Sequence, residues 1–307
     1  RLPSAKNKFN IDLVNLFNKK TYNQDKKELK IILNILNNNI FKSNVAPYEL
    51  SRSRIENFIK CRACFWLEQI KGVKPPEFPS FTINTTTDIL LKRDSDTVRG
   101  KCSLPLWDAN GLGHLIPFEH ENLEKWTSSL HYGTNDNYFN AVHTESNIKL
   151  GGGLDDVFFN TQSGQIHIVD YKSCAQGTRS PVKYEKKPVS LSEPWKVGYK
   201  RQMDIYVWVA REKGLDVSDI SYFVYVDAQH KDIKGMLIDQ DPGKAWMEFA
   251  ATIIPYRVNN SWIAPTLIEI RSFLEKQVTC PEHTPKEGYR GCDLGRYTNE
   301  VIAASHK

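Results

Sequence analysis

The sequence predicts an α/β fold, because strand patterns and helix patterns alternate along the middle of the chain. Residues 166–172 are rich in β-branched residues and have the pattern of a buried strand, and residues 154–159 have the pattern of the strand before it. Polar turn residues at 160–165 separate the two runs, which predicts a hairpin. A helix from about Lys200 and a further strand at 220–226 complete the pattern.

The segments before the hairpin are predicted to be mainly helical. Residues 1–47 combine apolar helix faces with a stretch rich in lysine and asparagine, and we expect a small helical extension there. Ser53 and Glu56 have the spacing of a capping box for a helix that runs to about residue 70. Residues 93–147 contain prolines and several glycines, and we expect an insertion before the first strand of the hairpin.

The segments after the hairpin contain a basic, proline-rich loop at 175–196, which joins the buried strand to the next helix. Residues 233–238 are expected to pair with the strand at 220–226. Helices are predicted at 242–254 and 262–278. Residues 48–307 would thus form one α/β domain after the N-terminal extension.

Composition limits the class of protein. The chain has 307 residues, of which 40% are hydrophobic, so it can bury the core of one elaborated domain. No apolar run approaches the ~18 residues that a membrane helix needs, and no signal peptide is visible. Six cysteines without a paired pattern are typical of a reducing interior, so we expect an intracellular protein, cytoplasmic or nucleoid-associated. The net charge of +5 mildly favours an anionic partner.

Two carboxylates and a lysine give the main chemical signal. Asp170 and Lys172 lie two residues apart on a strand, so their side chains share one face, and the hairpin can bring Asp155 beside them. Two adjacent carboxylates repel each other unless a cation lies between them, and hard oxygen ligands favour Mg²⁺ or Mn²⁺. Such an ion can orient and acidify a water and bind a phosphate, which suits phosphodiester hydrolysis. The alternative is a hairpin with a surface salt bridge.

Two further motifs lie on helices. Gln202 and Tyr206 occupy positions i and i+4 of one helix face, and the helix that begins near Ser51 and Ser53 leads to Cys61. Together with the Gly152-to-Asp155 motif and Asp170-Tyr171-Lys172, these four motifs occur in the order that resembles the PD-(D/E)XK nuclease superfamily. The resemblance is to its RecB-like branch, similar to the AddB and CRISPR-adaptation nuclease domains, and covers roughly residues 48–300.

The resemblance implies a restriction-endonuclease-like core, with a mixed central sheet flanked by helices. It implies a metal-dependent nuclease in DNA repair or recombination. Among the possible nuclease activities, it favours an exonuclease that acts on single DNA strands or on ends. Asp155 and Asp170, with the Tyr171 carbonyl, would bind the metal; Lys172 would be the catalytic lysine; Gln202 and Tyr206 would brace the site and contact nucleic acid. The main alternative is a non-catalytic nucleic-acid-binding or assembly subunit of a recombination or CRISPR-adaptation complex. A sugar or nucleotide phosphohydrolase is a third class.

Three acidic residues leave two choices of interpretation. Many relatives have a histidine ligand on an upstream helix, and Asp88 stands in the comparable stretch of this chain. Asp88 is either a third carboxylate for the metal or an ordinary solvated helix residue. Asp155 and Asp156 point to opposite faces of a strand, so only one of them should reach the metal, and the spacing from Gly152 favours Asp155.

The cysteines predict a second site. Relatives in the RecB-like branch often hold a [4Fe–4S] cluster with one cysteine from the N-terminal helix and three from a C-terminal segment. Gly295 stands where the resemblance implies the third cysteine of the C-terminal segment. Cys64 can replace that missing ligand, because it lies on the same helix face as Cys61. A [4Fe–4S] cluster or Zn²⁺ is therefore expected on four cysteines: Cys61, Cys64, Cys280 and Cys292. His283 is a weaker candidate for a ligand. The alternative is a lost cluster and buried thiols.

Overall fold

The chain is described by a computed structural model that covers most residues after Val45. The described residues are 46–74, 82–128, 137–175, 188–230, 233, 235–237, 241–285 and 291–305. The expected helical extension at 1–47 and most of the basic loop at 175–196 lie outside them. Within the described residues, no helix combines the length and apolar character needed to cross a membrane.

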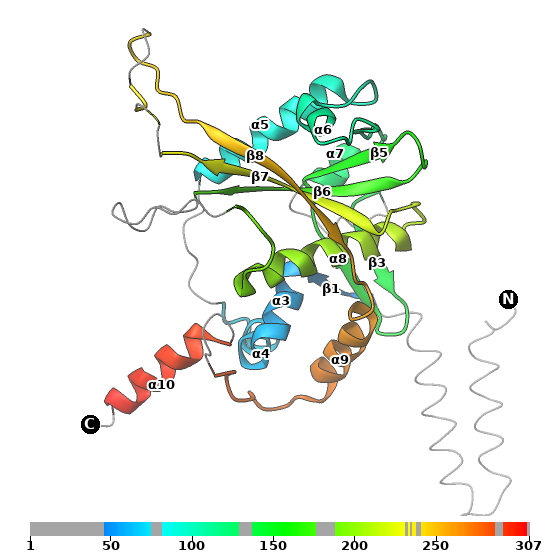
Figure 1. Cartoon of the computed structure of the whole chain (residues 1–307). Coiled ribbons are helices and arrows are strands. Elements are labelled where there is room, and N and C mark those ends of the chain that lie inside the picture. The colour runs from blue at the N-terminus through cyan, green and yellow to red at the C-terminus, as the bar shows by residue number, and fades with distance from the viewer. Residues whose placement is uncertain are drawn as a thin grey trace, which may run out of the picture. The chain divides into compact units, whose positions relative to one another are not determined.

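A five-stranded mixed sheet lies at the centre (Figure 1). β6 and β7 run parallel, and the other neighbouring strands run antiparallel. The sheet confirms the predicted fold class, and the pairing of Phe159 with Ile166 confirms the hairpin. In spatial order the strands are β2 (Leu115–Pro117), β5 (Asp156–Asn160), β6 (Ile166–Cys174), β7 (Ile220–Ala228) and β8 (Phe249–Arg257).

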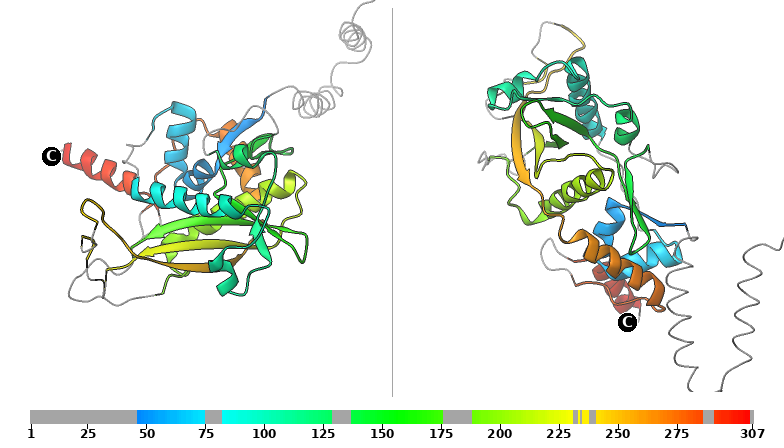
Figure 2. Two further views of the ribbon diagram at one scale, coloured as in Figure 1. Left: turned by 90° about the horizontal axis from the view of Figure 1, so that it is seen from above. Right: turned by 90° about the vertical axis from the view of Figure 1, so that its right-hand side faces the viewer.

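A helical crossover joins the two parallel strands, as parallel neighbours require. Its described part contains a 3₁₀ turn at Pro194–Lys196 and helix α8 at Val197–Glu212. α8 covers one face of the sheet, and α5 (Thr82–Val98) covers the other (Figures 1 and 2). Successive side chains of β6 therefore meet different helices. The Tyr171 hydroxyl lies 2.9 Å from Ser95 Oγ of α5, whereas Asp170 faces α8.

A smaller three-stranded sheet leads the chain into the hairpin. Its order is β1 (Tyr48–Ser51), β4 (Ile148–Gly151) and β3 (Asn140–His143), with β4 parallel to β1 and antiparallel to β3. β4 ends at Gly151, and the bend that follows carries the chain to β5. This bend holds the predicted Gly152-to-Asp155 motif at the junction of the two sheets.

Residues 93–147 contribute to both sheets and to short helices α6 (Pro105–Ala109) and α7 (Leu123–Thr127). Three of their aromatic side chains are buried in the described part of the range: Trp107, Trp126 and Phe139. Trp107 is 1% exposed and stacks on Phe158 of β5, with ring centroids 4.3 Å apart. Packing in the core accounts for this tryptophan.

The N-terminal capping box and the continuous helix to about residue 70 are wrong. Ser51, not Ser53, is the N-cap, and its Oγ accepts a hydrogen bond from the Arg54 amide at 3.4 Å. The helix is also divided into α3 (Arg52–Lys60) and α4 (Arg62–Lys71). Cys61 lies between them in an extended conformation, with φ of −157° and ψ of 108°.

The predicted helix at 242–254 is also wrong, because Phe249–Arg257 is strand β8. β7 needs a partner for its backbone groups along the side away from β6, and nine residues of β8 supply it. Residues 233–238, expected to fill this place, form no strand where they are described, and the remainder lie outside the described residues. Helix α9 (Ile263–Lys276) confirms the prediction at 262–278, and α10 (Asp293–Ser305) follows.

Candidate functional site

Strand β6 and the bend before β5 place the two predicted carboxylates together. Asp155 Oδ2 accepts a hydrogen bond of 2.9 Å from the Tyr171 amide. Asp170 is 1% exposed, and its Oδ1 accepts a hydrogen bond of 2.8 Å from Gln202 Nε2. The Lys172 ammonium forms an ion pair with Asp170 Oδ2 and donates to the Tyr171 carbonyl at 3.3 Å. Residues from three separate motifs therefore meet in one group.

Tyr206 supports Gln202 from the next turn of α8. Gln202 Nε2 also donates to the Tyr206 hydroxyl at 3.2 Å. The Tyr206 ring lies against the backbone of Gly152, where an added Cβ would stand 2.7 Å from the Tyr206 Cε1 atom. Gly152 is therefore needed to let the helix pair of Gln202 and Tyr206 approach the carboxylates.

Asp156 faces away from this group, as the alternation of strand side chains predicts. Its carboxylate is fully buried and accepts two hydrogen bonds from Arg99, at 3.0 and 3.3 Å. The Tyr171 hydroxyl donates a third at 2.9 Å. The network fixes β6 against the end of α5. Sequence reasoning missed Arg99, because its distance from Asp156 along the chain gives no local signal.

Lys92 was also missed, although its spacing from Asp88 is that of an i, i+4 ion pair. The Lys92 ammonium lies 3.1 Å from Asp88 Oδ2 and 3.7 Å from Asp155 Oδ1. The Lys92 ammonium thus links Asp88 to the carboxylate of Asp155.

The charges of this group depend on one another. Burial, followed by the neighbouring charge of Asp170, raises the pKa of Asp155 to about 7. Burial and the charge of Asp155 likewise raise the pKa of Asp88. Burial alone would lower the pKa of Lys172, but the carboxylates of Asp170 and Asp155 outweigh it and raise the pKa, so Lys172 stays an ammonium. A divalent cation would stabilise the ionised form of Asp155, which burial and the charge of Asp170 disfavour.

The donor set fits a hard divalent ion. Asp155 Oδ1, Asp170 Oδ2 and the Tyr171 carbonyl are all oxygens, and oxygen ligands suit Mg²⁺ or Mn²⁺. Asp170 Oδ2 is buried and forms an ion pair with the Lys172 ammonium. Among the described residues, it accepts no other hydrogen bond. This oxygen is available to a cation.

A buried ion pair joins α3 to α8. Arg201 Nε and Nη2 each donate to the Glu56 carboxylate at 2.7 Å, and Glu56 is 6% exposed. Burial opposes ionisation of Glu56, but the hydrogen bond from Arg201 outweighs it and lowers the pKa. Arg201 directly precedes Gln202, so this pair anchors the helix turn that supports Asp170.

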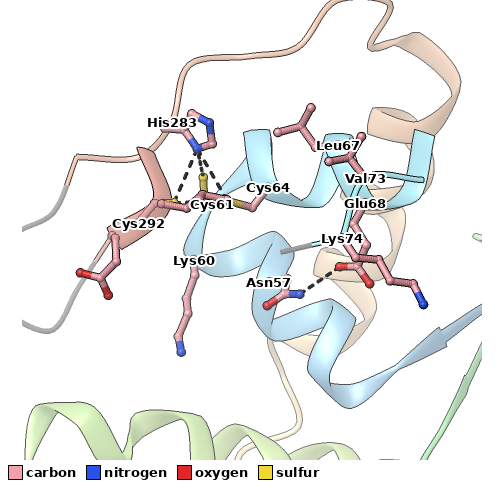
Figure 3. A pocket seen from close by; sticks show the side chains of 13 residues that line it. Asn57, Lys60, Cys61, Cys64, Leu67, Glu68, Val73, Lys74, His283 and Cys292 are labelled. Atoms are coloured by element: carbon pink, nitrogen blue, oxygen red, sulfur yellow. Dashed lines mark hydrogen bonds between the residues drawn. The ribbon is translucent and has the colours of Figure 1, made fainter. Parts of the chain in front are cut away.

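The cysteine prediction is partly wrong. Figure 3 shows His283, in the segment between α9 and α10, directed toward the cysteines of the α3–α4 junction. Cys280 is exposed, and its thiol donates to the Pro281 carbonyl at 3.4 Å, so it does not join them. Pro281 fixes the backbone after Cys280, and the chain turns His283 inward instead. Four ligating atoms lie within 4.8 Å of one another: those of Cys61, Cys64, His283 and Cys292.

The other two cysteines lie outside this group. Cys102 is exposed. Burial and the Asp227 carboxylate, which accepts a hydrogen bond from the thiol, raise the pKa of Cys174 to about 12. Cys174 is therefore a thiol at neutral pH and a poor nucleophile.

Comparison with known families agrees with the geometry. The model of the PD-(D/E)XK nuclease superfamily matches residues 49–257, more than half of the chain. The chain belongs to the PD-(D/E)XK nuclease superfamily. The match includes every candidate of the carboxylate group and ends before the segment that carries His283. A comparison with curated proteins gave no significant match. Membership in the superfamily indicates a nuclease that acts on nucleic acid, and metal dependence is typical of PD-(D/E)XK enzymes.

Proposed function

We propose that this PD-(D/E)XK protein is a metal-dependent nuclease of the RecB-like branch that hydrolyses phosphodiester bonds in DNA, starting from single strands or free ends. The observation that carries the proposal is the convergence of Asp155, Asp170 and Lys172 under the support of Gln202. The order of the four sequence motifs supports the branch. A role in repair or recombination inside the cell follows from the same resemblance.

Asp155 and Asp170, with the Tyr171 carbonyl, would hold Mg²⁺ or Mn²⁺. Asp88 would add a third negative charge on the side of α5, where Lys92 links it to Asp155. The ion, when bound, supplies Lewis acidity toward the scissile phosphate and toward a water. The two carboxylates repel each other, and this repulsion favours occupation by a cation.

Lys172 is the proposed catalytic lysine. Its buried ammonium stands beside Asp170, so it can hold the attacking water and offset the charge that develops on the phosphate. Gln202 is a positioning residue, because it fixes Asp170 through Oδ1 and leaves Oδ2 toward the ion. Tyr206 holds Gln202 in that orientation.

Labelled nucleic acids test the proposal. Single- and double-stranded DNA and RNA, linear and circular, should be incubated with Mg²⁺, Mn²⁺, Ca²⁺ or EDTA. We expect cleavage of linear DNA with Mg²⁺ or Mn²⁺, none with EDTA, and binding without turnover with Ca²⁺. Asp170→Asn and Lys172→Ala should fold normally and lose about 10²-fold or more in rate. Lys276→Ala, in the last turn of α9, is the matched control and should cleave like the parent.

Four outcomes would count against the proposal or a part of it. Undiminished cleavage by both purified variants would reject the site, and full activity after chelation would reject the metal. Tight DNA binding without cleavage under every metal condition would instead favour the non-catalytic assembly subunit. Preferential cleavage of RNA would support the nuclease activity but contradict the proposal that the substrate is DNA.

A further inference from the structure

The group around His283 has the dimensions of a site for one metal ion. His283 Nδ1 lies 3.4 Å from Cys61 Sγ, 3.6 Å from Cys64 Sγ and 3.5 Å from Cys292 Sγ. Cys64 Sγ lies 3.2 Å from Cys292 Sγ. Zinc bonds of about 2.3 Å to sulfur and 2.0–2.1 Å to nitrogen, at tetrahedral angles, would set such atoms about 3.5–3.8 Å apart. The four atoms thus stand close to the corners of a zinc tetrahedron.

The same distances exclude a cubane cluster from this arrangement. A [4Fe–4S] cluster places four irons and four sulfides between its ligand atoms, so those atoms must stand well apart. Here all four ligand atoms lie within 4.8 Å of one another. A single ion fits between them, and an eight-atom cage does not.

Gly295 makes room for the histidine. A Cβ added at Gly295 would stand 2.4 Å from His283 Cβ and 2.7 Å from its Cγ. Gly295 lies inside the first turn of α10, where alanine would ordinarily be favoured over glycine by about 1 kcal/mol. The position where a cysteine was expected is therefore empty of side chain so that an imidazole can serve as the fourth ligand.

Backbone amides support the sulfurs. The amides of Cys64 and Thr284 hydrogen-bond to the sulfur of Cys61, and the Gly295 amide donates to Cys292 Sγ at 3.3 Å. Such donors orient thiolate ligands and spread their negative charge. Cys61 and Cys292 are themselves buried, so the site is closed on the side of the protein.

We propose that Cys61, Cys64, His283 and Cys292 bind one structural Zn²⁺ in place of the iron–sulfur cluster expected at this position. The site goes beyond the nuclease proposal, since it shares no residue with the carboxylate group. Its four protein ligands leave no open position for chemistry, which is typical of structural zinc. The ion fastens the segment before α10 to the junction of α3 and α4.

Metal analysis of the purified full chain tests this directly. We expect one zinc per chain, with neither iron nor acid-labile sulfide, after purification under nitrogen without added metal. Apo protein titrated with Co²⁺ should develop the absorption of tetrahedral cobalt with thiolate ligands at one equivalent. Cys292→Ser and His283→Ala should lose the zinc. Cys280→Ser and Cys102→Ser are the matched controls and should retain it.

The test separates this site from the nuclease site. Asp170→Asn should keep one zinc per chain even if it no longer cleaves, and failure of the nuclease assays leaves the zinc result intact. Iron with sulfide, absence of metal, or loss of zinc in Cys280→Ser would each overturn the proposal. These readouts on the parent chain and on Cys280→Ser hold even if Cys292→Ser fails to fold.

Discussion

At the scale of single residues, the site is governed by the protonation of Asp155. An ordinary aspartate has a pKa of about 3.9, whereas burial and Asp170 raise that of Asp155 to about 7. Its proton and the proposed metal ion would therefore compete for the same carboxylate over the neutral range. The proton stabilises the metal-free fold, and this stabilisation is lost as pH rises through about 7, since the ionised form is the unfavourable one.

Metal affinity should follow this titration. Binding of Mn²⁺ should strengthen about tenfold per pH unit from pH 5 to about 7 and then level off, because only ionised Asp155 can be a ligand. Calorimetric titration at a series of pH values measures this. Asp155→Asn should bind weakly with a much smaller dependence on pH. A flat affinity between pH 5 and 7 in the parent would contradict the assignment.

Gly152 offers a test of positioning. Gly152→Ala places a Cβ 2.7 Å from the Tyr206 ring, so Tyr206 and Gln202 should shift from Asp170. We expect a drop in kcat of about 10²-fold at a nearly unchanged melting temperature. Gly198→Ala, whose Cβ would meet only an ordinary 3.5 Å contact with Glu56, is the control. Equal rates for the two variants would show that Tyr206 does not act on the site.

At the scale of elements, α3 and α8 are coupled through Glu56 and Arg201. Removing one partner leaves the other charge largely buried, which costs about 3–5 kcal/mol in comparable pairs. Because Arg201 precedes Gln202, this ion pair links the packing of α3 against α8 to the position of Gln202 beside Asp170.

A double-mutant cycle measures that coupling. Glu56→Gln and Arg201→Ala should each lower the free energy of unfolding, and the double variant should lose less than their sum. Both single variants should also lower kcat. The exposed pair of Asp241 and Lys244 is a control for which removal should change stability by less than about 1 kcal/mol. Strict additivity at Glu56 and Arg201 would refute the coupling.

Elements with a strong local pattern were predictable, and those set by distant partners were not. The β5–β6 hairpin and α8 follow from periodicity and turn residues, so Asp170, Lys172 and Gln202 could be placed from sequence. The sequence predicts a helix where β8 lies, because its alanines and mixed polarity carry no strand pattern. Its strand state comes from pairing with β7, which is long-range.

At the scale of the whole molecule, each site is assembled from segments far apart in the chain. Lys92 and Arg99 come from α5 and the residue after it, across the sheet from α8, so no spacing rule could connect them to Asp155 and Asp156. The His283 group likewise joins residues more than two hundred positions apart. The sequence predicts the three converging cysteines but favours Cys280 over His283 as the fourth ligand. Which side chain of an irregular segment points inward is set by tertiary packing.

Loss of a ligand from the His283 group should lower the stability of the protein more than its cleavage rate. Cys292→Ser should lower the melting temperature by several degrees, because a bound ion offsets the entropy of closing so long a loop. Cleavage measured at low temperature should fall by less than about threefold, since the carboxylate group has separate ligands. Thermal scans beside cleavage rates check both values. A Cys292→Ser variant with an unchanged melting temperature and a large loss of cleavage rate would contradict a purely structural role for this site.

The contact between Gly295 and His283 also constrains how this protein can change over evolution. A side chain at position 295 is incompatible with the present path of residue 283, even for alanine, because the two Cβ atoms would collide at 2.4 Å. A variant with cysteine at 295 would need a different path for the preceding segment, and Cys280 lies in that segment. Glycine at 295 and histidine at 283 should therefore be inherited as a pair, so that an alignment of close relatives shows them appearing and disappearing together.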